Sequence, residues 1–225
     1  MAKQELYERS PIRAFDEAAN GGLKAGELGL VTSKKGVGKT AVLVQFGMDT
    51  LLNGKQLVHV SFDQLSANVI TWYDTILGEI SKKKSIPADV KETLLRNRTI
   101  LNFNQDNFSL EKVVNTLNAL KAGGIGVAGV VIDGVDFGKA KESDIQAVAS
   151  YAKATKSKIW ISSTADSDKF ADQAPKSILP YFADVVHLSA SKAAGTVVQI
   201  LKAGKKENVA STLKLDPKTS LIVSK

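Results

Sequence analysis

Residues 33–41 of this chain have the composition of a loop that could hold phosphate groups. An apolar run, 28–31, precedes them, and a pattern typical of a helix follows. An apolar strand, a loop with glycines, Gly-Lys-Thr and a helix form the context that a phosphate-binding loop requires. In such a loop, backbone N–H groups turn inward around an anion, and the helix N-terminus adds its positive dipole end. The residues expected to bind nucleotide are Ser33, Lys34, Lys35, Gly36, Val37, Gly38, Lys39, Thr40 and Ala41.

Two residues of this loop have side chains that could act directly on phosphates and on a metal ion. Lys39 is placed to reach the β- and γ-phosphates, and the Thr40 hydroxyl is placed to bind Mg²⁺. The loop departs from the usual pattern because Ser33 stands where glycine opens the motif. A lysine-rich surface turn is the alternative, but it leaves the apolar strand before the loop unexplained. The sequence therefore predicts a site for ATP and Mg²⁺.

A carboxylate at the end of another apolar strand could complete the metal site. The apolar run 129–132 leads directly into Asp133. A phosphate-binding loop of this kind needs an acid at the tip of a neighbouring buried strand, to hold Mg²⁺ directly or through water. The alternative is a turn, because Asp133-Gly134 is also a favourable turn dipeptide. We expect Thr40 and Asp133 to be the metal ligands.

The pattern of elements along the chain predicts one α/β domain over residues 1–225, with 1–10 as a short N-terminal arm. Strands and helices alternate up to residue 163, which favours a mostly parallel central sheet flanked by helices. Short strands separated by turns follow, which favours antiparallel hairpins at the C-terminal end. The expected strands are 27–32, 57–62, 99–103, 126–133, 158–163, 185–188, 196–202, 211–215 and 220–223.

Local signals predict where several helices begin and end. The first helix is expected to have Ser10 as its N-cap and Pro11 in its first turn. The helix after the phosphate-binding loop is expected to end near Leu52, before Asn-Gly. Further helices are expected over 69–80, 87–95, 109–120 and 144–155.

The composition limits the chemistry and the partners of the chain. Its 225 residues include 30 Lys and Arg and 23 Asp and Glu, so the formal net charge is 30 − 23 = +7, and there is no cysteine. The absence of cysteine excludes disulfides, thiolate metal sites and cysteine nucleophiles. The positive charge is compatible with nucleic acid as a partner, although lysine-rich surfaces are often only solvated. No apolar run approaches the roughly 18 residues of a membrane span, and no signal segment is evident, so we expect a cytoplasmic protein without a membrane partner.

The order of the motifs resembles that of the RecA-like ATPases, and within them the DnaB-type replicative helicase core and the KaiC/RadA group. The resemblance covers nearly the whole chain and depends on the order and spacing of motifs that are individually loose. Besides the loop, it is carried by Phe15-Asp16, Gly21-Gly22-Leu23, Gly26-Glu27-Leu28, Val60-Ser61-Phe62-Asp63, Gly129-Val130-Val131-Ile132-Asp133-Gly134, Ile161-Ser162-Ser163-Thr164 and Ala183-Asp184-Val185-Val186. It implies a RecA-like fold, binding of Mg–ATP, and ATP hydrolysis by a homo-oligomer acting on or near nucleic acid.

The resemblance also implies catalytic roles for residues outside the loop. Asp63 stands at the position of the family's catalytic glutamate, which activates the attacking water, but its side chain is one methylene shorter. Thr164 follows the sensor strand, where the family commonly has glutamine. The charge that stabilises the transition state usually comes from a neighbouring subunit, as an arginine in DnaB-type helicases. The matching region here contains Lys202, Lys205 and Lys206 instead.

These departures leave two classes of function open. The first is an oligomeric ATPase that couples hydrolysis to a conformational change. The second is a nucleotide-binding regulatory or scaffold module with weak or no hydrolysis, which the residues at positions 63 and 164 and the missing arginine favour. A ParA/MinD-type ATPase is a further alternative, because Lys34 could be the signature lysine of that family's loop. That family, however, has glycine where Lys35 stands.

Overall fold

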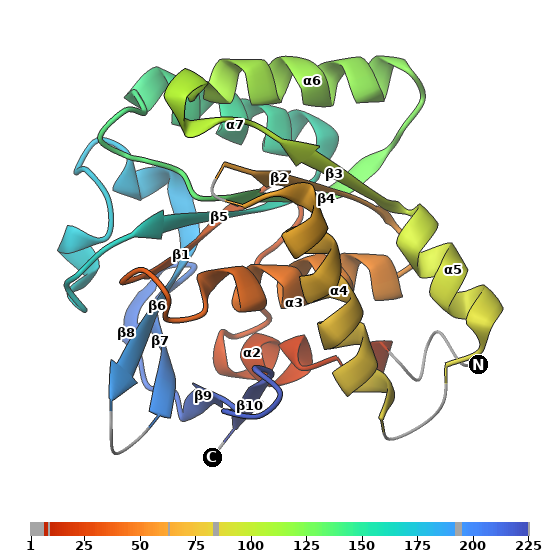
Figure 1. Ribbon diagram of the computed structural model, residues 1–225. Coiled ribbons are helices and arrows are strands. Elements are labelled where there is room, and N and C mark those ends of the chain that lie inside the picture. Colours follow the sequence, from red (N-terminus) through yellow and green to blue (C-terminus); the bar gives the residue numbers. More distant parts are fainter. Residues whose placement is uncertain (1–6, 9, 63, 83–85, 192–194, 225) are drawn as a thin grey trace.

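A sheet of ten strands forms the centre of the described part of this computed structural model, which comprises residues 7–8, 10–62, 64–82, 86–191 and 195–224 (Figure 1). The strands are β1 (Leu28–Ser33), β2 (Gln56–Ser61), β3 (Arg98–Asn102), β4 (Val127–Asp133), β5 (Lys158–Thr164), β6 (Phe182–Ser191), β7 (Gly195–Ala203), β8 (Lys206–Val209), β9 (Leu213–Leu215) and β10 (Ile222–Ser224). Their order is β10-β9-β7-β6-β1-β5-β4-β2-β3, and β8 pairs with β7. Strands β1 to β6 pair in parallel, whereas β7 to β10 pair antiparallel. The expected α/β fold, with a mostly parallel sheet and an antiparallel C-terminal end, is therefore confirmed.

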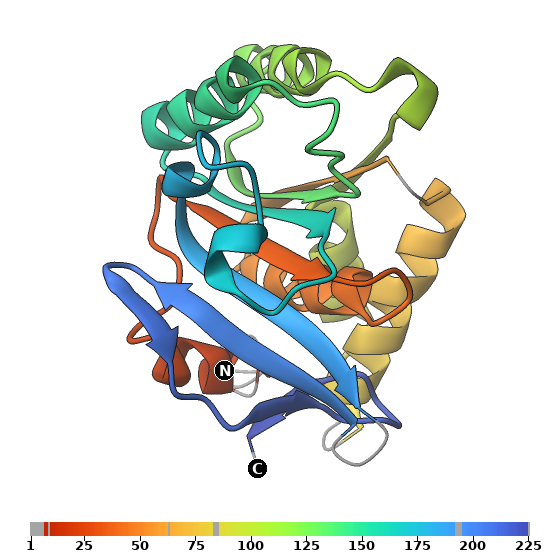
Figure 2. The same ribbon diagram turned by 90° about the vertical axis from the view of Figure 1, so that its left-hand side faces the viewer.

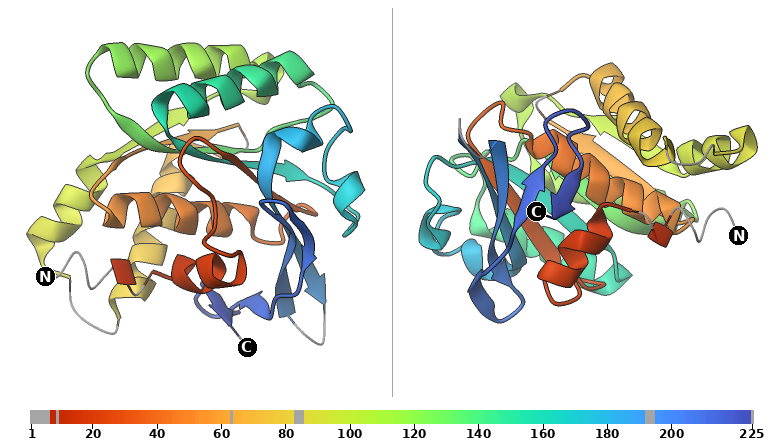
Figure 3. Two further views of the ribbon diagram at one scale, coloured as in Figure 1. Left: turned by 180° about the vertical axis from the view of Figure 1, so that it is seen from behind. Right: turned by 90° about the horizontal axis from the view of Figure 1, so that it is seen from below.

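Helices cover both faces of this sheet. They are α2 (Ile12–Ala18), α3 (Lys39–Leu52), α4 (Ser66–Ser81), α5 (Ala88–Arg96), α6 (Leu110–Ala122) and α7 (Glu142–Thr155). Seen from the front and from behind, α2 and α3 lie on one side of the sheet, and α6 and α7 lie on the other (Figures 1 and 3). Among the described residues, no helix has the length and apolar character needed to cross a membrane.

Alternation along the strands divides the core into two layers. In β1, Leu28 and Leu30 face the layer that holds α6 and α7, whereas Val31 faces the layer that holds α2, α3 and α4. In β4, Val130 faces the layer of α6 and α7, and Val131 faces the layer of α2, α3 and α4. Successive side chains of a strand point to opposite faces, so a sheet covered on both sides needs apolar residues at every position. This explains why the parallel strands read as continuous apolar runs.

Local signals predict the start of α6 correctly and miss the start of α2 by one residue. The Ser109 hydroxyl accepts the N–H of Lys112 at 3.2 Å, as expected for the N-cap of α6. The prediction for α2 is wrong by one residue, because Pro11 occupies the N-cap position. Ser10 lies just outside the helix, where its hydroxyl still accepts the N–H of Ile12 at 3.3 Å.

The C-terminal strands, drawn in blue in Figure 2, differ from the prediction in their extent. β6 is longer than the expected 185–188 because it pairs with both β1 and β7. β9 is shorter than the expected 211–215. β8 was not expected, because its four residues are mostly exposed and do not alternate between polar and apolar types. These differences arise where strand pairing, rather than local pattern, decides the structure.

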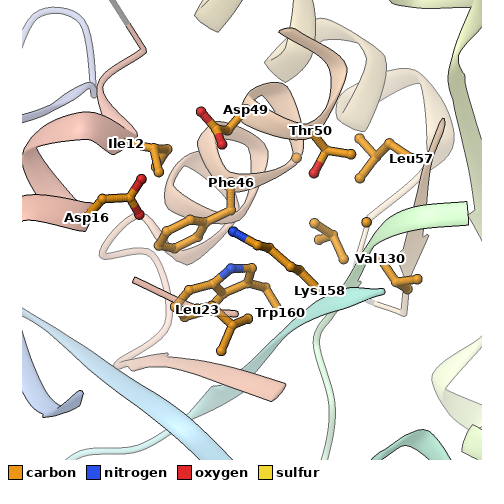
Figure 4. Close-up of a pocket in the computed structure, with 13 residues that line it drawn as sticks. Ile12, Asp16, Leu23, Phe46, Asp49, Thr50, Leu57, Val130, Lys158 and Trp160 are labelled. Atoms are coloured by element: carbon orange, nitrogen blue, oxygen red, sulfur yellow. The ribbon is translucent and has the colours of Figure 1, made fainter. Parts of the chain in front are cut away.

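Two aromatic rings hold α3 against the sheet. Phe46 of α3 stacks on Trp160 of β5 with ring centroids 3.8 Å apart and an interplanar angle of 7° (Figure 4). The Trp160 ring also covers Gly29 of β1, where a Cβ would lie 2.4 Å from a ring atom. A cavity of about 30 Å³ beside these rings has room for water-sized molecules alone. This part of the molecule is therefore packed core and not a ligand site.

The contact between Gly29 and Trp160 predicts a loss of stability when a methyl group is added. We expect Gly29→Ala to lower the free energy of unfolding by about 1–3 kcal/mol, because a rigid indole must shift to make room. Urea denaturation measures the change. Gly126→Ala is the matched control, because a Cβ at Gly126 meets no atom within 4 Å. Equal stabilities of the two variants would contradict this account of the packing.

Candidate nucleotide-binding site

The loop between β1 and α3 has the backbone conformation of an anion cradle. It joins the end of β1 at Ser33 to the start of α3 at Lys39. Gly36 has φ 81° and Gly38 has φ 120°, values that favour glycine because a Cβ would be strained there. Within the described residues, the backbone N–H groups of 35–38 donate to no backbone oxygen. These N–H groups, together with the first turn of α3, form a place where an anion is favoured.

Lys39 lies over this loop. Its Nζ atom is 3.2 Å from the backbone oxygen of Ser33, 3.4 Å from Ser33 Oγ and 3.3 Å from the backbone oxygen of Lys34. Ser33 is fully buried, and its hydroxyl donates to the backbone oxygen of Lys34 at 2.7 Å. Serine therefore fits the position where the motif usually has glycine, and the lysine ammonium is held at the loop.

Asp133 joins three elements at the carboxyl ends of the parallel strands. Its Oδ2 accepts the hydroxyl of Thr40 at 2.7 Å, and its Oδ1 accepts the hydroxyl of Ser162 at 2.5 Å. The N–H of Gly134 donates to Ser162 Oγ at 2.9 Å. The carboxylate of Asp133 thus faces the loop and does not cap the turn that follows it. The N–H of Gly134 in that turn is bonded to Ser162 instead. Sequence reasoning assigned no role to Ser162, although a hydroxyl near the end of a neighbouring parallel strand was a usable signal.

Gln64 is a second residue of the site that sequence reasoning missed. It lies between β2 and α4, and its Nε2 donates to Thr40 Oγ1 at 2.8 Å. The signal available was its position directly after Asp63, at the end of a buried strand. Asp63 itself, the expected water-activating residue, lies outside the described residues.

Thr164 lies between the loop and Asp133. It ends β5, the strand that separates β1 from β4, and it pairs in register with Ser33. The N–H of the next residue, Ala165, donates to the backbone oxygen of Ser33 at 3.1 Å. Thr164 also lines the cavity that contains the loop. The topology therefore brings Thr164 beside the loop and into the cavity that Asp133 also lines.

The loop, Gln64, Asp133 and Thr164 line one cavity of about 760 Å³, within the range of about 300–1,000 Å³ that is usual for ligand sites. The loop and the strand ends form one wall. The opposite wall comes from the C-terminal part of the chain and was not expected. The lining residues that the motifs did not indicate are Gln64, Trp72, Gly195, Thr196, Leu215, Asp216, Pro217 and Ser220.

Gln45 fastens the C-terminal wall to α3. Its side chain is fully buried and donates to the backbone oxygen of Ser220 at 2.9 Å. Its Oε1 accepts the N–H of Ile222 at 2.8 Å. A Cβ on Gly38 would lie 3.0 Å from Leu215 Cδ1, so the β9 residue packs directly on the loop. The helix that follows the loop therefore also positions the opposite side of the cavity.

Lys202 and Lys205 lie at the other end of the sheet. Lys202 pairs in register with Val185, near the start of β6, and its Nζ donates to the backbone oxygen of Phe182 at 2.7 Å. Phe182 in turn pairs with Leu28, the first residue of β1, whereas the loop follows the last. Lys205 is exposed in the turn between β7 and β8. The fold thus does not bring these lysines to the cavity of their own chain.

The carboxylate of Asp184 is buried beside this turn. Its Oδ1 accepts the N–H of Gly204 at 3.1 Å, and its Oδ2 has no hydrogen-bond partner within the described residues. Burial raises the pKa of Asp184 to about 6, against the effect of the Gly204 hydrogen bond. Burial likewise raises the pKa of Asp16 to about 6. Both carboxyl groups are more easily charged in the unfolded chain.

The chain is an α/β protein whose mostly parallel sheet carries this cavity at the carboxyl ends of its strands. Comparison of the sequence with protein-family models found no match, and a search of curated proteins found none either.

The raised pKa of Asp184 predicts how stability changes with pH. An unfolded aspartate has a pKa of about 3.9, so the folded state holds its proton more tightly. The resulting stabilisation is fully present below pH about 4 and is lost as pH rises through about 6. We therefore expect Asp184→Asn, which cannot titrate, to gain on the order of 2 kcal/mol relative to the original protein between pH 4 and pH 7. Urea unfolding across this range measures the difference, and parallel curves for the two proteins would contradict it.

Proposed function

We propose that this chain binds Mg–ATP in the cavity at the carboxyl ends of β1, β5 and β4. The hydrogen bond between Thr40 Oγ1 and Asp133 Oδ2, 2.7 Å long, is the observation that carries the proposal. The two residues are 93 positions apart in the sequence, and each belongs to a separate motif that predicts a magnesium ligand. Their contact at the mouth of a glycine-containing loop supports a single site for a metal and phosphates.

The residues present fit a magnesium ion that arrives with its nucleotide. Mg²⁺ prefers oxygen ligands and usually keeps several waters, with one or two protein ligands and substrate phosphates. Thr40 and Asp133 offer a hydroxyl and a carboxylate. Within the described residues there is no cluster of three or more His, Cys, Asp or Glu side chains that could hold a metal alone. The proposed ion would thus depend on the phosphates for the rest of its coordination.

Each part of the cavity has a task in this proposal. The N–H groups of residues 35–38 and the ammonium of Lys39 bind phosphate oxygens and offset their charge. Thr40 and Asp133 hold Mg²⁺, which neutralises charge on the phosphates when it is bound. Thr164 adds its hydroxyl to the lining of the cavity, between the loop and Asp133. The proposal includes a RecA-like fold, which the parallel core and the antiparallel C-terminal strands support.

The proposal predicts that nucleotide binding depends on Lys39. We expect Lys39→Ala to weaken ATP binding by about ten- to a hundredfold, because a hydrogen-bonded positive charge on the phosphates is lost. Calorimetric titration with ATP and Mg²⁺ measures the affinity. Lys121→Ala, which removes an exposed lysine near the end of α6, is the control and should leave the affinity unchanged. Equal affinities of both variants for ATP would oppose the proposal.

A second candidate function is nucleotide binding without turnover in the isolated chain. The observation that favours it is the position of the positive charges. Among the described lysines, those lining the cavity are Lys35 and Lys39 of the loop itself, and Lys202 and Lys205 lie at the far end of the sheet. A transition-state charge of the kind that phosphoryl transfer uses would then have to come from a neighbouring copy.

An ATPase that uses a neighbouring copy and a module that only binds ATP differ in how ATP turnover responds to protein concentration. If a neighbouring copy supplies Lys202 or Lys205, the rate per chain should rise as the protein associates, and Lys202→Ala or Lys205→Ala should lower it while ATP affinity stays the same. Steady-state phosphate release over a range of concentrations, with and without single-stranded DNA, measures this. A constant rate per chain would exclude a contribution in trans, and ATP binding without release at any concentration would favour the binding module.

A further inference from the structure

Gln64 holds a place in the cavity that the phosphate and metal motifs leave unexplained. It follows β2 and precedes α4, and it lines the cavity together with Thr40 and Asp133. Its Nε2 donates to Thr40 Oγ1 at 2.8 Å, across the gap between β2 and the first turn of α3. A side-chain amide is therefore bonded directly to the hydroxyl expected to ligate the metal.

The backbone of Gln64 is held by the ends of two neighbouring strands. Its N–H donates to Ser61 Oγ at 2.9 Å. Its carbonyl oxygen accepts from Asn102 Nδ2, and Asn102 pairs in register with Ser61. Both partners are the last residues of their strands, β2 and β3. The side-chain amide of Gln64 thus reaches Thr40 from a connection whose backbone is hydrogen-bonded to the ends of β2 and β3.

Within the described residues, the hydrogen bonds of Thr40 leave one lone pair of its hydroxyl unused. A threonine hydroxyl has one hydrogen to donate and two lone pairs to accept with. The hydrogen goes to Asp133 Oδ2, and the Gln64 amide uses one lone pair. One lone pair remains. Because both other bonds are directional, the hydroxyl cannot rotate freely, and its remaining lone pair keeps one direction.

We propose that Gln64 is a positioning residue for the Mg²⁺ that accompanies the nucleotide, acting through the Thr40 hydroxyl. The inference rests on the proposed function of the cavity and adds to it a residue that sets metal affinity. Groups that orient a metal ligand without touching the metal typically change metal affinity by about 10–100-fold when removed. A merely structural role for Gln64 would instead disturb the loop and weaken nucleotide binding with or without Mg²⁺.

Gln64→Met tests this role, because methionine approximates the length of glutamine and removes the donor. We expect the Mg²⁺ concentration at half-saturation of the ATP complex to rise about 10–100-fold. We expect the affinity for ATP in excess EDTA to stay within about twofold of the original protein, because the loop and Lys39 are untouched. Calorimetric titrations of ATP in EDTA, and of Mg²⁺ into the protein with ATP, give the two values. Gln56→Met is the matched control, since Gln56 lies at the other end of β2 and donates to Asn97 Oδ1 at 3.0 Å.

The outcomes separate this inference from the function on which it rests. If the original protein binds ATP neither in EDTA nor with Mg²⁺, the proposed function is overturned and, with it, the role of Gln64. Binding of ATP by the original protein, with an unchanged Mg²⁺ midpoint in Gln64→Met, overturns the role of Gln64 alone. An equal loss of ATP affinity in EDTA and in Mg²⁺ also overturns it and assigns Gln64 to loop structure. Only a selective change in Mg²⁺ affinity, absent from Gln56→Met, supports the inference.

Discussion

The buried carboxylate of Asp133 is the group through which the site is assembled. It is 2% exposed, and each of its oxygens accepts a hydroxyl hydrogen, one from Thr40 and one from Ser162. A buried polar group left without partners costs about 1–3 kcal/mol, and a charged one costs more. The start of α3 and the carboxyl ends of β4 and β5 therefore have to meet in one arrangement. Since α3 begins where the loop ends, the same bonds set the loop against the sheet.

The rest of the core keeps α3 in the place that this contact requires. Phe46 stacks on Trp160 along one side of the helix, and the close approach of Trp160 to β1 needs the missing side chain of Gly29. Gln45 of the same helix then hydrogen-bonds the C-terminal wall of the cavity, through the backbone oxygen of Ser220 and the N–H of Ile222. Helix α3 therefore contacts both the sheet and the C-terminal part of the chain that lines the cavity. A shift of this helix would change both walls together.

The two ends of the sheet have different chemistry. At the carboxyl ends of the parallel strands, the loop with its glycines and two lysines, the hydroxyls of Thr40 and Thr164 and the carboxylate of Asp133 line the cavity. The opposite end carries Lys202, bonded to a backbone oxygen, and the buried Asp184. This separation follows from β7 running antiparallel to β6, which sends the end of β7 away from the loop. Any cooperation between the two ends has to occur between chains, so a role for Lys202 in ATP turnover would require two copies of the chain to associate.

Much of the fold and half of the site could be predicted from the sequence, because the signals are local. The alternation of strands and helices, the glycines of the loop and the cap at Ser109 each depend on residues within one turn or strand. What only the tertiary structure decided are contacts between distant segments. Strand order brought Ser162 and Gln64 to Asp133 and Thr40, packing brought the C-terminal hairpin over the loop, and antiparallel pairing carried Lys202 away from it. Spacing along the chain specifies a residue's neighbours within an element, but pairing between strands specifies which ends of those elements meet.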